Sequence, residues 1–263
     1  MAKSLSIVTW NVNSVNARIE SVKKFLQEYN PDVVLFQELK CMDEKFPFEV
    51  IEELGYNIET YGQKTYNGVA IISKFPIDDV VKGIPSFEDD NSRYIEGIIC
   101  LPDSAVRVAS VYVPNGNEVG SEKFRYKMNF FDALQGHMAE IKNYDEKVIV
   151  GGDFNVAPTE IDVFDPKSLA NTICFHPDEQ EKYRGLVNTG YHELFRCHHP
   201  DKQEFSWWDY RGGAWNYNKG LRIDFIFANA LAADSSQDCR IISEPRGHEK
   251  ASDHAPVWCD IDI

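Results

Sequence analysis

Apolar positions along the chain follow two different periods. Short continuous apolar runs at residues 5–10, 32–36 and 147–150 are bounded by polar or turn-forming residues, which is typical of buried strands. At about 17–29 and 122–142 the apolar residues instead recur every three or four positions, which predicts amphipathic helices. The chain therefore mixes helices and strands.

The remaining pattern predicts a largely β-rich chain with a few more helices. Further strands are expected at 57–61, 69–73, 94–101, 106–113, 204–210, 221–228, 240–243 and 257–263, and helices near 48–54 and 178–189. The four strands from 57–61 to 106–113 have the spacing of an antiparallel meander. Because no linker rich in Pro, Gly or Ser divides the chain, we expect one α/β domain over residues 1–263, with mixed sheets covered by helices.

Composition places the chain among ordinary globular proteins. It has 263 residues, of which 43% are hydrophobic and 26% charged. It contains no apolar stretch of about 18 residues and no signal segment, which predicts a soluble, cytoplasmic protein, and we expect a monomer. The six cysteines are scattered along the sequence, so we interpret them as reduced structural thiols.

Net charge argues against a protein that coats nucleic acid. The chain has 27 basic and 42 acidic residues, giving a formal charge of −15. An acidic enzyme can still bind DNA when a metal ion neutralises some of its carboxylates and its basic side chains cluster around one site. A nucleic-acid function therefore requires such a local cluster.

Three apolar strands end in residues that could ligate a metal. The first runs into Asn11, the second into Glu38, and the third into Gly151, Gly152 and Asp153. Because ligands of such sheets bind at the carboxyl ends of the strands, these side chains are expected to meet at one edge. Oxygen ligands of this kind favour Mg²⁺, with Mn²⁺ as an alternative.

A second group of polar residues precedes the last strand. Asp253 and His254 come immediately before it, and they reach the same edge if this strand is antiparallel. Asp224 lies inside an apolar run, where a carboxylate needs a partner, and His254 is the natural one. Each feature alone is more typical of a turn or a helix cap, but their combination in one chain favours a catalytic site.

Eight short motifs also resemble a known family, in family order and from end to end of the chain. They are TWNVNSV (9–15), QELK (37–40), YNGVAI (66–71), SVYVPNG (110–116), GGDFNVAP (151–158), FSWWDYR (205–211), GLRID (220–224) and SDHAP (252–256). On these strings the chain resembles the exonuclease III group of the endonuclease/exonuclease/phosphatase superfamily.

The resemblance implies a four-layer αββα sandwich of two mixed sheets and a Mg²⁺-dependent DNA repair nuclease. Such an enzyme cleaves duplex DNA 5′ to abasic sites and removes 3′ nucleotides or 3′ blocking groups. The metal site would draw on Asn11, Glu38, Asp153, Asn155, Asp253 and His254, with Glu38 as the principal ligand. The catalytic groups would be Tyr112, Asp153, Asn155, Asp224 and His254.

Within that catalytic set each residue has an implied role. Asp153 would orient or deprotonate the attacking water, Asn155 would hold a phosphate oxygen, and Tyr112 would face the phosphate or the leaving oxygen. His254, braced by Asp224, would contact the phosphate. Whether His254 acts as a base or only stabilises charge, and whether one or two ions act, is left open.

DNA contacts are expected around an aromatic segment near residues 205–224. Aromatic faces interleaved with cations suit unstacked nucleotides, although a core strand followed by a polar loop would give a similar pattern. By the resemblance, Trp207, Leu221 and Ile223 would form a small apolar pocket for a base-free deoxyribose. The other expected DNA-binding residues are Asn115, Lys64, Arg211 and Lys219. Further cations that would lie along the DNA are Lys40, Lys123, Arg125 and Lys127. Alternatively, the last three form only a solvated helix face.

Some features depart from the family pattern and leave alternatives. Residues 162–189 match the family spacing less well, and Glu193 stands where a shorter aspartate is expected. The balance of abasic endonuclease, 3′ exonuclease and 3′ phosphatase activity therefore stays open. The alternatives to a DNA nuclease are a related phosphodiesterase or phosphatase acting on RNA or a phospholipid head group, and a non-catalytic DNA-binding protein.

Overall fold

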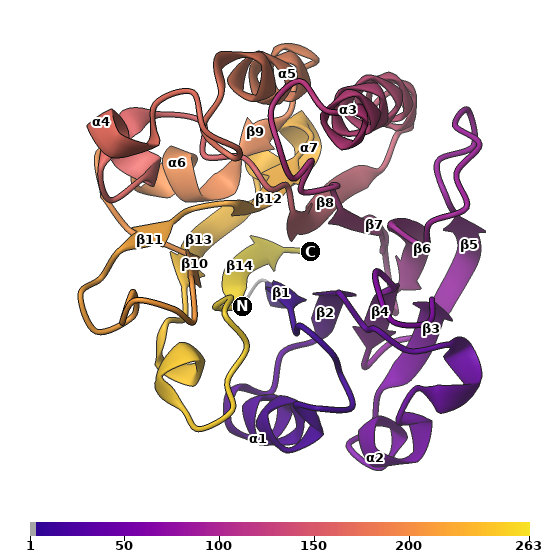
Figure 1. Cartoon of the computed structure of the whole chain (residues 1–263). Coiled ribbons are helices and arrows are strands. Elements are labelled where there is room, and N and C mark those ends of the chain that lie inside the picture. The colour runs from indigo at the N-terminus through magenta and orange to yellow at the C-terminus, as the bar shows by residue number, and fades with distance from the viewer. Residues whose placement is uncertain (1–3) are drawn as a thin grey trace.

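The computed structural model describes residues 4–263, which form two β-sheets packed face to face between helices (Figure 1). The first sheet has six strands in the order β13-β14-β1-β2-β4-β3. They are β1 (Ser4–Asn11), β2 (Val33–Gln37), β3 (Asn57–Tyr61), β4 (Val69–Ser73), β13 (Ser236–Ile241) and β14 (Val257–Asp262). Because β1 is parallel to β2 and antiparallel to β14, the ends of β1 and β2 lie at the edge where β14 begins, as predicted.

The second sheet also has six strands, in the order β5-β6-β7-β8-β12-β9. They are β5 (Ile77–Lys82), β6 (Tyr94–Cys100), β7 (Ala105–Tyr112), β8 (Lys147–Asp153), β9 (His192–Glu193) and β12 (Asp224–Ala228). A separate ribbon joins β10 (Trp207–Trp208) and β11 (Gly220–Leu221). Since β7 and β8 are parallel and β12 is antiparallel to β8, this sheet repeats the arrangement of the first.

Helices cover the outer faces of both sheets (Figure 1). The helices are α1 (Ile19–Tyr29), α2 (Phe48–Glu52), α3 (Glu122–Ile141), α4 (Pro166–Leu169), α5 (Pro177–Asn188), α6 (Leu194–His198) and α7 (Ala230–Ala233), with 3₁₀ turns at Asp43–Lys45, Glu160–Asp162 and Glu244–Gly247. α1 and α2 lie outside the first sheet, and α3 and α5 lie outside the second. The expected αββα sandwich is confirmed. Within residues 4–263, no helix combines the length and apolar character needed to cross a membrane.

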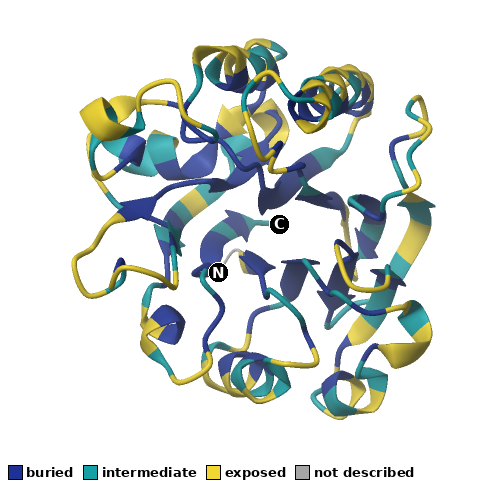
Figure 2. Ribbon diagram, viewed as in Figure 1, coloured by how far each residue is buried: buried dark blue, intermediate teal, exposed yellow. Residues whose placement is uncertain are grey.

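Three apolar layers hold the sandwich together. The middle layer lies between the sheets and includes Leu35 of the first and Ile149 of the second, both fully buried. Phe25 of α1 packs onto the first sheet, and Phe131 of α3 packs onto the second. Figure 2 shows the consequence, with buried strands at the centre and exposed helix faces turned outward. Burial of the apolar faces of these helices, at roughly 25 cal/mol per Å², stabilises the layers.

Two glycines allow close backbone approach at the end of β8. A Cβ on Gly152 would lie 2.0 Å from the carbonyl oxygen of Val111 on the neighbouring strand, which is a steric overlap. A Cβ on Gly151 would lie 2.8 Å from Leu35 Cδ1 and 3.1 Å from Thr9 Cβ in the facing sheet. Gly151 therefore lets the second sheet approach the first beside Asp153, and Gly152 lets β8 lie close to β7 within the second sheet.

The structure differs from the predicted meander. The strands 69–73 and 94–101 were expected in one sheet, but β4 pairs with β2 and β3 in the first sheet and β6 pairs with β5 and β7 in the second. The chain changes sheets through β5, an edge strand that the pattern did not predict because its burial alternates irregularly. Fully apolar strands carry no periodic signal that identifies their neighbours.

Two further predicted strands are shorter than expected. Of 204–210 only Trp207–Trp208 is a strand, and the run 221–228 is interrupted after Leu221. The interruption has a polar cause, because Arg222 turns inward and its Nε and Nη1 donate to Asp162 Oδ1 at 2.7 Å and Glu193 Oε2 at 2.8 Å. A buried guanidinium requires such partners, and the chain leaves strand geometry at Arg222 to reach them.

The Gly152 position supports a first prediction. Gly152→Ala should lower the free energy of unfolding by about 1–3 kcal/mol or more, because the added methyl overlaps the Val111 carbonyl. Gly136→Ala, in the exposed middle of α3 with no atom near its Cβ, is the matched control and should raise it by about 0.5–1 kcal/mol. Urea unfolding followed by circular dichroism measures both, and equal stability of the two variants would contradict the steric account.

Candidate active site

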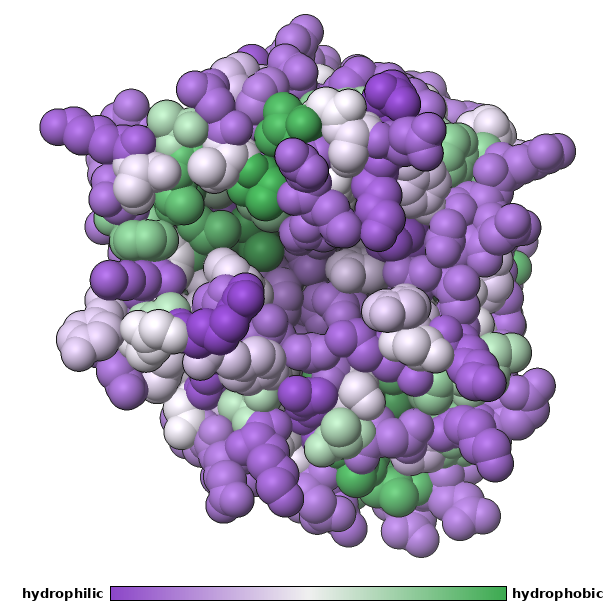
Figure 3. All heavy atoms as spheres, in the orientation of Figure 1, coloured by the Kyte–Doolittle hydropathy of each residue, from purple (hydrophilic) through white to green (hydrophobic). Residues whose placement is uncertain are grey.

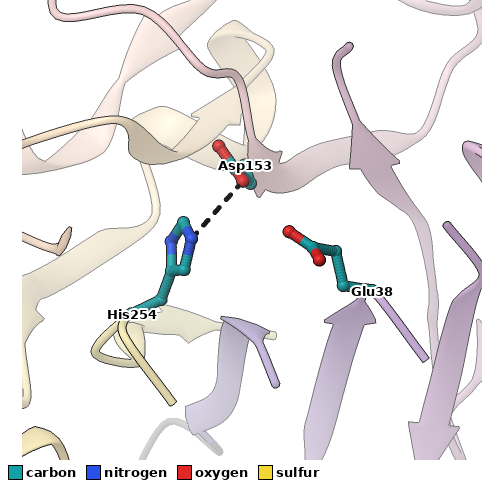
Figure 4. A group of neighbouring side chains, drawn as sticks. All are labelled: Glu38, Asp153 and His254. Carbon is teal, nitrogen blue, oxygen red and sulfur yellow. Dashed lines mark ion pairs between the residues drawn. The ribbon is translucent and has the colours of Figure 1, made fainter. Parts of the chain in front are cut away.

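Strands of both sheets bring three charged side chains together at one edge of the sandwich. Glu38 follows β2, Asp153 ends β8, and His254 precedes β14. One potential ligand atom from each lies within 4.8 Å of the others, a spacing that allows a shared metal ion. Figure 4 shows Glu38 and Asp153 directed into the same space, with the ring of His254 toward Asp153.

Asn11 links the two carboxylates of this group. Its Nδ2 donates to Glu38 Oε1 at 2.8 Å and to Asp153 Oδ2 at 2.9 Å, while its Oδ1 accepts from the backbone N–H of Asn13 at 3.0 Å. Toward the two carboxylates, the Asn11 side chain therefore presents its amide N–H groups and not its oxygen. To ligate a metal through Oδ1, as the sequence predicts, it would have to exchange its two amide atoms.

His254 and Asp224 form the predicted pair. His254 Nδ1 lies 2.9 Å from Asp224 Oδ2, and Ser206 Oγ donates to the same oxygen at 2.6 Å. Burial alone would lower the pKa of His254, but Asp224 and then Asp153 outweigh it and raise the pKa to about 10. This shift favours the imidazolium in the metal-free protein, so His254 would have to lose a proton before a ring nitrogen could ligate a metal.

Asp153 has the opposite electrostatic environment. Burial raises its pKa to about 7, and the neighbouring carboxylates Asp224 and Glu38 add to the effect, although His254, 3.7 Å away, opposes it. Its oxygens also accept from the backbone N–H of Asn155 at 2.9 Å. A carboxylate with a pKa near neutrality can take up a proton under physiological conditions.

Glu38 remains ionised. Burial acts to raise its pKa, but the Lys40 ammonium and the hydrogen bond from Asn11 outweigh burial and lower the pKa. Lys40 Nζ lies 2.7 Å from Glu38 Oε2 and also contacts Asn13 Oδ1. Both Glu38 and Lys40 have a positive φ, of 54° and 55°, so a strained turn directs the pair into the site.

On the far side of Asp153, asparagines and a tyrosine line the site. Asn155 Nδ2 donates to the Val113 carbonyl at 2.9 Å, and Asn155 Oδ1 accepts from Asn115 Nδ2 at 3.0 Å. Tyr112, at the end of β7, has a pKa well above 10 because it is buried beside Glu38 and Asp153. The guanidinium of Arg93 lies 4.7 Å from the Tyr112 ring centroid. Tyr112 therefore keeps its hydroxyl proton and can donate it in a hydrogen bond.

Asp253 adjoins this group without belonging to its closest members. Its Oδ1 accepts from Asn13 Nδ2 at 2.8 Å and its Oδ2 from Trp207 Nε1 at 3.0 Å. Burial acts to raise the pKa of Asp253, but His254 and these two donors outweigh it and lower the pKa. Asp253 is therefore an ionised carboxylate that joins the charged group to the aromatic segment.

The side chains fit a hard divalent cation. The closest potential metal ligands are carboxylate oxygens of Glu38 and Asp153, with Asp253 and amide oxygens nearby. Mg²⁺ and Mn²⁺ prefer oxygen ligands of this kind. Burial, and then repulsion from Asp224 and Glu38, raise the pKa of Asp153, and a bound cation would favour its ionised form. His254 fits this role least, because it is protonated.

An apolar pocket opens beside the charged group. A cavity of about 470 Å³ extends from Asp153 and His254 to an apolar wall. That wall consists of Leu169, Ile173, Trp207, Leu221 and Ile223. Figure 3 shows green, hydrophobic surface over α4 and β11 next to the purple hollow at the centre of this face. The three predicted pocket residues are thus brought together, and α4 with the loop after it supplies a wall that the sequence did not predict.

A second, polar cavity of about 550 Å³ lies on the other side of Glu38 and Tyr112. Its lining includes Tyr66, Arg93, Lys123 and Tyr126. The two cavities share Glu38, Tyr112 and Asn115, so together they form one continuous concave surface across the site.

The expected DNA-binding cations are mostly exposed. Lys64, Arg211 and Lys219 all lie on exposed loops. Arg211 forms an ion pair with Asp209 at 2.8 Å, and Lys219 Nζ lies 5.7 Å from the Tyr217 ring centroid. Lys127 fits neither expectation, a contact with DNA or a solvated helix face, because its side chain is completely buried.

Several site residues were not singled out from the sequence. Asn13 belongs to the TWNVNSV string, and its polar neighbours could have indicated it. Ser206 belongs likewise to the FSWWDYR string, whereas Arg93 and Ile173 had no such signal, because an isolated Arg or Ile near a strand or in a loop is common. Their importance comes from the partners that the fold brings to them.

Glu193, which stands where a shorter aspartate was expected, lies in a buried charge network and not in the site. Glu193 accepts from Arg222 and from the backbone N–H of Phe195 and Arg196, so it caps α6. Its longer side chain therefore serves the packing of α6 against the second sheet.

Comparisons with known proteins agree with this geometry. The model of the Endonuclease/Exonuclease/phosphatase family matches residues 8–254, and the chain belongs to that family. Exodeoxyribonuclease III of Haemophilus influenzae is 32% identical over 97% of this chain and 99% of that protein.

Solved structures with the same fold include two DNA-processing enzymes. The 3′-5′ exonuclease NExo of Neisseria meningitidis superposes with a TM-score of 0.94 at 36% identity, covering 98% of this chain and 100% of that chain. An AP endonuclease from Archaeoglobus fulgidus superposes with a TM-score of 0.93 at 34% identity and the same coverage. The fold and the family are thus shown by both sequence and structure.

The raised pKa of Asp153 leads to a prediction about the metal-free protein. A carboxyl whose pKa is higher in the folded than in the unfolded state lowers stability as pH rises from about 3.8 to about 7. Asp153→Asn should therefore raise the free energy of unfolding at pH above about 7. This increase should vanish at about pH 4, where Asp153 is protonated in the folded protein. Urea unfolding in the presence of a chelator measures this, and a variant less stable than the wild type at high pH would contradict it.

Proposed function

We propose that the chain is a Mg²⁺-dependent DNA repair nuclease that hydrolyses the phosphodiester 5′ to abasic sites and removes 3′ nucleotides or blocking groups from duplex DNA. The observation that carries the proposal is the juxtaposition of the Glu38–Asp153–His254 group with an apolar pocket large enough for a sugar. The relatives named exodeoxyribonuclease and AP endonuclease support the same substrate class. We propose that residues 1–263 act as one catalytic domain; a monomeric state and a cytoplasmic location stay predictions from the sequence.

Glu38, as the principal ligand, would hold the ion with Asp253 and Asn11 close by, and Asp153 and Asn155 adjoin it. When bound, the ion would supply positive charge for the phosphate oxygens as negative charge develops. Glu38 suits this role because it stays ionised.

The chain's own residues would divide the remaining work. Asp153, with a pKa near neutrality, would accept the proton of the attacking water. Asn155 and the His254 imidazolium would bind phosphate oxygens, and His254 would then stabilise charge while Asp153 acts as the base. The hydroxyl of Tyr112, which stays protonated, would face the departing oxygen.

Substrate selection would occur in the pocket and on the surface around it. The apolar wall with Trp207, Leu221 and Ile223 would favour a base-free deoxyribose, because these three apolar side chains do not match the polar edge of a base. Asn115, Lys64, Arg211 and Lys219 would contact the DNA backbone around it.

A second candidate function shares this chemistry. A structure of the 3′ phosphatase NExo from Neisseria, bound to a product DNA hairpin, superposes with a TM-score of 0.95 at 36% identity. The same charged group could hydrolyse a 3′-phosphomonoester, because water attack on phosphorus needs the same metal, base and oxygen contacts. Relative rates on an abasic duplex, a recessed 3′ end and a 3′-phosphate end decide which activity dominates.

Removal of the Glu38 carboxylate tests the proposal. Glu38→Gln should lower Mg²⁺-dependent cleavage of a duplex with one abasic site by about 100-fold or more, since the metal loses its principal ligand. Glu20→Gln, on the exposed face of α1, is the control and should cleave like the wild type. Normal turnover by Glu38→Gln, or phosphoinositide cleavage without DNA cleavage by the wild type, would contradict the assignment.

Trp207 allows the pocket and its polar contact to be separated. Trp207→Ala should weaken binding of an abasic duplex by about 1–3 kcal/mol, because both the apolar wall and the N–H to Asp253 are lost. Trp207→Phe keeps a smaller aromatic side chain in the wall but loses the N–H, so most binding should remain. Fluorescence anisotropy in Ca²⁺ measures both, and equal losses would show that the wall contributes little.

A further inference from the structure

A buried ion pair lies behind Asn155 and Asn115. Lys127 of α3 and Glu179 of α5 are both fully buried, and their charged groups are in direct contact. Lys127 Nζ also donates to the backbone carbonyl of Asn155 at 2.7 Å and to that of Asn115 at 3.1 Å. The three protons of the ammonium thus have three acceptors, two of which belong to the loops that line the site.

Helix packing does not require this pair. α3 and α5 are already joined by an apolar layer that includes Phe131 and Leu186, and an exposed pair, Lys182 and Asp132, links the same helices at 2.5 Å. Taking two charges out of water costs free energy that their attraction does not reliably recover, so a buried pair is weak evidence of stabilisation. The feature that the exposed pair lacks is the contact with the two carbonyls.

Those carbonyls belong to a strained and connected segment. Asn155 has a φ of 49°, in the left-handed region, and Gly116, the residue after Asn115, has a φ of 88°. The stem of Lys127 lies beneath that turn, since a Cβ on Gly116 would be 3.1 Å from Lys127 Cδ. The side chains of Asn155 and Asn115 are in turn hydrogen-bonded to each other. Holding both carbonyls therefore fixes the direction of both amide groups.

Glu179 in turn holds Lys127. Its second oxygen accepts from the backbone N–H of His176 at 3.0 Å, as part of the capping box that begins α5. The carboxylate is thus fixed to the start of a helix. Because it neutralises the ammonium at close range, the contribution of Lys127 to the site is geometric and not a free positive charge.

We propose that Lys127, fixed by Glu179, is a positioning residue that orients Asn155 and Asn115 toward the phosphate. The inference rests on the proposed function, in which these asparagines contact phosphate oxygens. Loss of the anchor should lower kcat by about 10- to 100-fold with little change in KM, since an oriented contact matters most in the transition state.

The double variant Lys127→Met/Glu179→Met separates positioning from stability. Each single variant leaves one buried charge unpaired and should be destabilised, whereas the double variant leaves neither and should regain most of that stability. The double variant should nevertheless keep the 10- to 100-fold loss of kcat. Return of both stability and kcat would overturn the proposal, because the pair would then be structural only.

Two comparisons complete the test. Lys182→Met/Asp132→Asn removes the exposed pair between the same helices and should leave kcat unchanged. Lys127→Arg keeps the ion pair but displaces the donors from the carbonyls, so it serves if the double variant does not fold. Unchanged kcat in folded Lys127→Arg would also overturn the proposal.

A measurement without turnover distinguishes this inference from the proposed function. Side-chain amide resonances of Asn155 and Asn115, assigned by NMR, should shift or broaden in Lys127→Arg but not in the Lys182 control. If the wild type cleaved none of the DNA substrates but these resonances responded as expected, the proposed function would fail and the anchoring would stand. Resonances that did not move would refute the anchoring whatever the activity.

Discussion

The structure depends on holding three carboxylates, Glu38, Asp153 and Asp224, close together in a largely buried place. Burial and the neighbouring like charges both disfavour the ionised form of Asp153, and they raise its pKa. Two devices compensate. The His254 imidazolium lies between Asp224 and Asp153, and Asn11 donates one hydrogen bond each to Glu38 and Asp153. The remaining repulsion would favour binding of a divalent cation.

The sandwich brings these groups together by a simple rule of strand direction. Residues at the carboxyl ends of β1, β2 and β8 lie at the same edge as residues at the amino ends of β14, which is antiparallel to β1, and of β12, which is antiparallel to β8. The two sheets contribute to one site because Gly151, near the end of β8, lets them approach. The pocket wall, in contrast, comes from α4 and the β10-β11 ribbon, which lie outside both sheets. Chemistry and substrate fit therefore rest on separate parts of the fold, so the pocket can vary while the charged group stays the same.

The large negative charge of the chain is compatible with DNA binding because the charge is unevenly distributed. Arg93 and Lys123 line the polar cavity. Lys64 lies on the loop just before Tyr66, which also lines this cavity. The carboxylates in the site are those that a metal ion would neutralise. Local potential at the site, and not net charge, then determines whether a phosphate is attracted.

Sequence alone determined the strand-end residues, the helices 19–29 and 122–141 within a few positions, and the Asp224–His254 pair. These follow from local chemistry, since apolar periodicity reports burial and a carboxylate within an apolar run needs a partner. The tertiary structure alone decided which sheet each apolar strand joins, the inward turn of Arg222 and the burial of Lys127. It also decided that α4 and its following loop would wall the pocket. The physical reason is common to all four: each depends on contacts between residues far apart in the chain, and no local pattern records which surface will pack against another.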